Sequence, residues 1–75
     1  MKAHVEYTDT FGGESNYAWV RRATIEAPTE LGIVRKAKEF AGLTGMKCER
    51  SHTGDMLTLT PVAISTVLFI MFEWE

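Results

Sequence analysis

The sequence predicts an α+β domain, a four- to five-stranded antiparallel sheet with one helix packed on one face, in the order ββαββ(β). Three observations favour this fold. Two segments near the amino terminus alternate apolar and polar residues, as half-buried strands do. One central segment repeats its apolar residues at three- and four-residue steps, as an amphipathic helix does. The last third has threonine-rich and β-branched stretches separated by turn residues.

With 75 residues, the chain is expected to be one small α+β domain, residues 1–75.

The first two strands are predicted at Lys2–Thr8 and Tyr17–Ala27, paired as an antiparallel hairpin. Asp9–Asn16, with two glycines and several small polar residues, is predicted to be a long loop between them. Pro28 ends the second strand because it cannot donate a hydrogen bond to a neighbour. The alternation would place five residues on one face of that strand: Tyr17, Trp19, Arg21, Ala23 and Ile25.

The helix is predicted at Glu30–Leu43. Thr29 has the residue type of a helix N-cap, and Glu30 puts a negative charge in the first turn, where it suits the helix dipole. Gly42 and Gly45 mark the C-terminal end of the predicted helix. The expected apolar stripe is Ile33, Val34, Ala37, Phe40 and Ala41.

Three more strands are predicted at Met46–His52, Met56–Thr60 and Ser65–Trp74, with a turn at Thr53–Asp55 and a break at Pro61. The last strand is apolar on both faces, so both faces must be covered, whereas one helix covers only one face of a small sheet.

Two explanations for this strand stay open. The face away from the helix is left open for association with a ligand or a second chain, including a homodimer through this C-terminal strand. Alternatively, the strand is simply central, and long side chains of its neighbours fold over it. The open face would carry Val67, Phe69 and Met71, or else Leu68, Ile70, Phe72 and Trp74.

Bulk properties exclude several classes of protein. Hydrophobic residues form 45% of the chain and charged residues 24%, which excludes a disordered protein. A net charge of −2 and a pI of about 5.6 argue against a nucleic-acid-binding domain, and direct nucleic-acid contact is not expected. One cysteine excludes an internal disulfide, and the sequence shows neither a signal peptide nor a membrane helix. We therefore expect a cytoplasmic protein with no membrane contact.

No catalytic, cofactor or metal site is expected, and the protein is predicted not to be an enzyme. Zinc sites need clustered ligands, but Cys48 and His52 would lie about 13 Å apart along one strand. A nucleophile pair would need His4 to cross the sheet to Cys48. The segment Phe11–Asn16 has two glycines but lacks the Lys-Ser/Thr of a phosphate-binding loop.

The segment that follows these glycines combines stacking groups with cations, in Tyr17, Trp19, Arg21 and Arg22. Single-strand nucleic-acid binders use this mixture. Trp, Tyr and Arg are also enriched in protein-binding hot spots, which fits an acidic domain better. A third explanation is that Trp19 belongs to the core and both arginines form cross-strand ion pairs.

The segments YTDTFGGESNYAWVRR, Tyr7–Arg22, and RKAKEFAGLTGMKCER, Arg35–Arg50, resemble a family of small proteins encoded by bacteriophages and mobile elements. The family shares an opening Thr-Asp-Thr-Phe/Tyr-Gly-Gly-Glu-x-Asn-Tyr-x-Trp-Val. The sequence is similar to a member described as an anti-CRISPR protein against the type I-C system.

The resemblance implies a non-enzymatic inhibitor in the cytoplasm of a host bacterium. It would bind a subunit of the type I-C surveillance complex, Cascade, and block recognition of target DNA. The alternative is a small nucleic-acid-binding or regulatory phage protein. Asp9 and Glu14 are expected to meet basic groups of the partner, and alanine at either position should leave folding intact. The predicted partner-binding residues are Asp9, Phe11, Glu14, Asn16, Tyr17, Trp19, Arg21 and Arg22.

Overall fold

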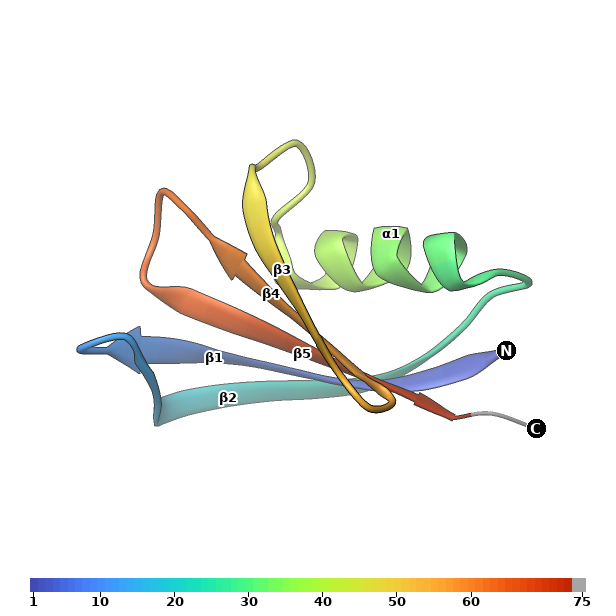
Figure 1. The fold of residues 1–75 in the computed structure, drawn as a ribbon, viewed down its shortest axis with the longest axis horizontal. Helices are drawn as coiled ribbons and strands as arrows, with labels where there is room; N and C mark the ends of the chain where they lie inside the picture. Colours follow the sequence, from blue (N-terminus) through green and yellow to red (C-terminus); the bar gives the residue numbers. More distant parts are fainter. Residues whose placement is uncertain (74–75) are drawn as a thin grey trace.

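The computed structural model of the chain describes residues 1–73 and contains one sheet and one helix. The helix lies across one face of the five-stranded sheet, and every pair of neighbouring strands is antiparallel, which confirms the predicted fold class (Figure 1). The elements are β1 (Lys2–Phe11), β2 (Glu14–Glu26), α1 (Glu30–Ala41), β3 (Cys48–Thr53), β4 (Met56–Pro61) and β5 (Thr66–Glu73).

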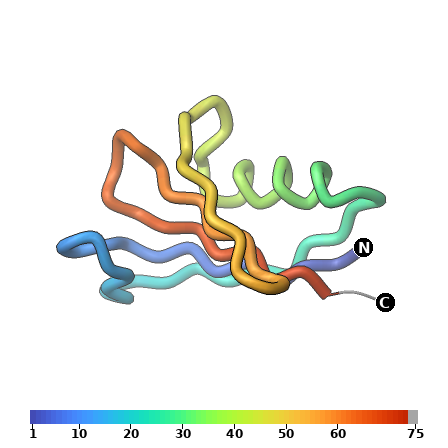
Figure 2. The backbone as a smooth tube through the Cα atoms, in the orientation of Figure 1, coloured from blue at the N-terminus to red at the C-terminus, as the bar shows by residue number. Residues whose placement is uncertain are grey.

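The strand order is β2-β1-β5-β4-β3, so the last strand of the chain is the middle strand of the sheet. The backbone tube in Figure 2 shows β5 running between the two hairpins β1–β2 and β3–β4. Both edges of β5 are hydrogen bonded, to β1 and to β4, which explains its continuous apolar sequence. Association through β5 would therefore have to use a face of the strand. Trp74, part of the predicted strand, lies outside the described residues.

The main core lies between the sheet and α1. Ala3 pairs with Phe72, Val5 with Ile70 and Tyr7 with Leu68, so alternate residues of β1 and β5 face the helix together. All six side chains are buried. They are joined in one apolar cluster by Ile25, Ala27, Ile33, Val34, Ala37, Ala41, Leu43, Leu57 and Leu59.

The ends of α1 follow from local chemistry. The Thr29 hydroxyl accepts a hydrogen bond of 3.1 Å from the Gly32 backbone amide, which confirms the predicted N-cap. The helix ends at Ala41, two residues before the predicted Leu43, because Gly42 adopts the left-handed conformation with φ of 71°. The third strand likewise begins at Cys48, two residues after the predicted Met46.

The predicted long loop Asp9–Asn16 is wrong. β1 continues to Phe11 and β2 begins at Glu14, so only Gly12 and Gly13 form the turn. Their φ angles of 63° and 84° are both positive, as in the tight two-residue turns of β-hairpins. The polar residues that suggested a loop belong to the strands, where they bond to each other.

The face of the sheet away from α1, called the open face below, carries Val67, Phe69 and Met71, the first of the two predicted sets. No helix among residues 1–73 covers it. The face is nevertheless partly covered: Val67 is buried although it lies outside the main core cluster, Phe69 is half-buried, and only Met71 is exposed. Neighbouring side chains therefore cover part of this face, and a large apolar face is not left open.

Candidate functional site

A bulge in β2 shapes the β1–β2 hairpin. Thr8 pairs with Val20 and Thr10 pairs with Ser15, so the single residue Asp9 on β1 faces four residues on β2. The Asp9 carboxylate accepts hydrogen bonds from the Asn16 side-chain amide at 2.9 Å and from the Ala18 backbone amide at 3.0 Å. The second bond satisfies a backbone amide within the bulge, where the pairing between β1 and β2 is interrupted, and the first ties the Asn16 side chain to β1. Asp9 and Asn16, predicted to bind a partner, thus hold the bulge together.

The buried Thr8 anchors the other side of the bulge. Its hydroxyl donates a hydrogen bond of 2.8 Å to the Trp19 backbone carbonyl. The Asn16 amide, the Ala18 backbone amide and the Thr8 hydroxyl lower the pKa of Asp9, in that order of importance, so this carboxylate is ionised at neutral pH.

Tyr17 is the one residue other than glycine with a positive φ, 54°, among residues 1–73. This conformation is rare for a bulky residue. It turns Tyr17 away from the face that strand alternation predicted, which it was expected to share with Trp19. Tyr17 instead lies over the open face, where it lines a hollow of about 360 Å³ with Glu6, Met56, Phe69 and Met71.

A hydrogen bond from the Tyr17 hydroxyl, reinforced by the Arg22 guanidinium, holds the pKa of Glu6 below its ordinary value. The Glu6 carboxylate in turn raises the pKa of Tyr17. The Glu6 carboxylate and the Tyr17 hydroxyl thus influence each other's protonation at the hollow that both residues line on the open face.

The two arginines point to opposite faces of the sheet. The Arg21 guanidinium lies 4.7 Å from the centre of the Phe40 ring, on the helix side. Arg22 pairs with Glu6 across the strands at 3.0 Å, on the open face. The cross-strand ion pair is confirmed for Arg22 but not for Arg21. Tyr17, Trp19, Arg21 and Arg22 therefore do not form one stacking platform.

Trp19 is not a core residue. Its side chain is 42% exposed and packs edge-on against the Tyr7 ring, with 5.2 Å between ring centres. The Tyr7 hydroxyl donates a hydrogen bond of 3.0 Å to Thr66 at the start of β5. Trp19 is thereby held at the end of the sheet where the β1–β2 turn lies.

The loop between β4 and β5 lies beside this turn. The Thr10 backbone amide donates a hydrogen bond of 2.9 Å to the Ser65 carbonyl, and both segments lie at the left of Figure 1, opposite the amino terminus. Phe11 before the turn is 79% exposed, and Val62 and Ile64 in the loop are 62% and 40% exposed. The loop residues were not predicted. The available signal was a run of apolar residues after Pro61 without strand alternation.

We call this region the hairpin-end surface. Five of the eight large hydrophobic side chains that are exposed among residues 1–73 lie on or beside it, with Tyr17 on the adjoining open face and Trp19 on the side of the sheet that Tyr7 and α1 occupy. The hairpin-end surface also carries Glu14, exposed and without a polar partner in the described part of the chain. Residues 7–20 contain two acidic and no basic side chains, and residues 56–72 contain no charged side chain. The five hydrophobic residues are Phe11, Tyr17, Trp19, Val62 and Ile64.

Among residues 1–73, no three His, Cys, Asp or Glu side chains lie close enough together to hold a metal ion. His4 on β1 and Cys48 on β3 are separated by two strands and face opposite sides of the sheet. No helix in this range has the length and apolar character needed to cross a membrane.

Comparison of the chain with protein-family models, with curated proteins and with solved structures found no match.

Proposed function

We propose that the protein is a non-enzymatic, phage-encoded inhibitor that binds a type I-C Cascade complex through the hairpin-end surface and blocks recognition of target DNA. The observation that supports this proposal most is that the β1–β2 hairpin and the β4–β5 loop bring exposed aromatic and aliphatic side chains to the same end of the sheet. Exposed apolar clusters of this kind mark interaction sites. Aromatic residues are also common among the residues that dominate binding energy.

The chemistry of the hairpin-end surface suits the proposed target. Its hairpin residues carry the carboxylates Asp9 and Glu14 and no lysine or arginine between Tyr7 and Val20, while Lys47 borders it where the Val62 amide donates to the Lys47 carbonyl at 3.1 Å. Protein channels that hold DNA present basic groups, which an acidic and apolar surface can contact. Host cytoplasm, where such a complex acts, is part of this proposal.

The resemblance noted in the sequence falls on the same region. Within the shared motif, Asp9, Gly12, Gly13 and Asn16 build the turn and the bulge. Other motif residues, Phe11, Glu14, Tyr17 and Trp19, are exposed on the resulting framework. One set fixes the shape and the other supplies contact area.

A gel-shift experiment tests the proposal. The protein is added to type I-C Cascade, followed by labelled target duplex at physiological salt, with a control lane lacking Cascade. We expect loss of the Cascade–DNA band at protein concentrations that do not shift free duplex in the control lane. An unchanged Cascade–DNA band would contradict the proposal. A shift of free duplex with an unchanged Cascade band would favour the alternative, a nucleic-acid-binding regulatory protein.

Matched variants locate the surface. Phe11→Ser removes an exposed aromatic side chain at the turn, whereas Leu31→Ser removes an exposed apolar side chain from α1. We expect Phe11→Ser to weaken inhibition about tenfold or more and Leu31→Ser to leave it unchanged. Equal effects of both variants would place the contact elsewhere.

A further inference from the structure

Charged side chains are divided unequally between the two sides of the molecule. The helix side comprises α1, the loop 42–47, and the residues of β2 and β3 that face α1. Arg21 belongs to it because it lies over Phe40, and Arg50 because it pairs with the core residue Leu59. Six of the eight basic residues of the chain lie on the helix side, namely Arg21, Arg35, Lys36, Lys38, Lys47 and Arg50.

The acidic residues show the opposite distribution. Of the nine acidic residues among residues 1–73, only Glu30 and Glu39 lie on the helix side, which gives that side a formal charge of +4, six positive and two negative. The other residues in this range include two basic and seven acidic residues, a formal charge of −5. The two values add to −1, and Glu75, outside the described residues, brings the sequence to its net charge of −2. The helix side is therefore strongly basic although the net charge of the whole chain is small.

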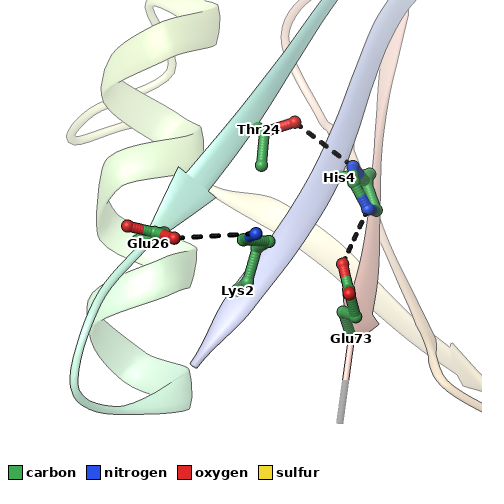
Figure 3. A network of polar contacts seen from close by, with 5 residues as sticks. All are labelled: Lys2, His4, Thr24, Glu26 and Glu73. Carbon is green, nitrogen blue, oxygen red and sulfur yellow. Dashed lines mark hydrogen bonds and ion pairs between the residues drawn. The ribbon is translucent and has the colours of Figure 1, made fainter. Parts of the chain in front are cut away.

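The basic groups of the open face are all neutralised by carboxylates. Lys2 pairs with Glu26 at 3.8 Å and Arg22 with Glu6 at 3.0 Å. His4 contacts Glu73 at 2.9 Å and Thr24 at 3.2 Å, so that polar contacts cross three strands (Figure 3).

The basic groups of the helix side have no carboxylate partner within residues 1–73. Lys36 donates to the Glu26 backbone carbonyl at 2.7 Å and Lys38 to the Met46 carbonyl at 3.2 Å, and neither ammonium group lies within ion-pair distance of a carboxylate among residues 1–73. Arg35 and Arg50 have no polar partner in the described part of the chain.

We propose that the helix side binds the phosphodiester backbone of duplex DNA. Uncompensated lysine and arginine side chains on a rigid surface are the groups that contact DNA phosphates. Duplex DNA is favoured over single strands because single-strand binding depends on exposed aromatic rings. Phe11 lies at the β1–β2 turn and Tyr17 on the open face, Trp19 is packed edge-on against Tyr7, and Arg21 covers Phe40. This contact uses a different surface from the proposed Cascade contact and does not depend on it.

Fluorescence anisotropy with a short labelled duplex of arbitrary sequence tests this inference. We expect a dissociation constant on the order of 10 to 100 µM at low salt, rising steeply with salt concentration. Two double variants lower the net charge equally: Arg35→Gln/Arg50→Gln on the helix side and Lys2→Gln/Arg22→Gln on the open face.

The helix-side variant should bind about tenfold more weakly and lower the salt slope by about 2, because each phosphate contact contributes about 0.9. The open-face variant should bind within about twofold of the unmodified protein. Equal weakening of both, weakening of neither, or tighter binding of a single strand of the same sequence would overturn the inference.

Two controls keep the outcomes distinct. Circular dichroism checks that both variants are folded. If the open-face variant unfolds, the single variants Lys2→Gln and Arg35→Gln make the same comparison with one charge each. Phe11→Ser should leave duplex binding unchanged, which separates failure of this inference from failure of the proposed Cascade contact.

Discussion

The Asp9 carboxylate accepts a hydrogen bond of 2.9 Å from the Asn16 side-chain amide, across the bulge that separates them in the β1–β2 hairpin. The second carboxylate oxygen accepts from the Ala18 backbone amide. One side chain thus satisfies a backbone amide within the bulge and ties the Asn16 side chain to β1. This arrangement gives Asp9 a structural role that the sequence analysis did not predict.

Replacing Asp9 by alanine should destabilise the hairpin, because the Asn16 and Ala18 donors lose their acceptor. We expect the melting temperature to fall by about 5 °C. Glu14→Ala is the matched control, since this carboxylate is exposed and has no polar partner among residues 1–73. Calorimetry that finds equal melting temperatures for the two variants would exclude the structural role of Asp9.

Stability should decrease in acid. The folded state lowers the pKa of Asp9 and of Glu6, so their contribution is present above the unfolded values of about 4. It is lost as the pH falls through the folded values, because the unfolded chain then binds more protons. Urea unfolding midpoints at neutral and acidic pH measure this loss. Asp9→Asn should reduce the change of the unfolding midpoint with pH. If the midpoint of this variant changes with pH as much as that of the unmodified protein, other groups cause the acid sensitivity.

Tyr17→Phe should raise the pKa of Glu6 toward its ordinary value, because the hydrogen bond from the Tyr17 hydroxyl is the main cause of the lowered value. Arg22→Gln should have a smaller effect, since Arg22 is a secondary cause. An NMR titration of the glutamate carboxyl carbons measures the pKa of Glu6 in both variants. A larger shift in Arg22→Gln would mean that the ion pair, and not Tyr17, controls this carboxylate.

Neighbouring residues of β5 should differ sharply in their effect on stability. Ile70 faces α1 and is fully buried, whereas Met71 lies on the open face and is exposed. Ile70→Ala should cost about 2–5 kcal/mol of unfolding free energy, enough to unfold much of so small a domain. Met71→Ala should cost less than about 1 kcal/mol. Denaturant unfolding measures the free energy lost in each variant. Similar losses in the two variants would contradict the placement of Ile70 toward α1 and of Met71 on the open face.

Most of the fold could be predicted from local patterns. Alternation placed β1 and β2, three- and four-residue spacing placed α1, and Thr29 marked its first turn. These patterns are reliable because burial on one face of an element requires that spacing. The hairpin connection could not be predicted in the same way. Asp9 and Asn16 are residue types common in loops, yet here they bond to each other within a bulge.

The candidate site was predicted less completely. Phe11 and Glu14 lie at the exposed turn, as expected, but Tyr17 left its predicted face because its φ is positive. Strand alternation fails wherever one residue adopts the left-handed conformation. Val62 and Ile64 were missed because they lie about fifty residues away in the sequence and meet the turn only through the Thr10–Ser65 hydrogen bond.

The sequence by itself determined the composition, the strand and helix periods and the caps, because these depend on residues within a few positions of one another. The tertiary structure alone decided which side each charge occupies. Arg21 and Arg22 are neighbours in the chain, yet one lies over Phe40 and the other pairs with Glu6. Successive strand residues point to opposite faces, and only the packing of α1 makes one face basic and leaves the other neutralised. A net charge read from the sequence cannot reveal that division.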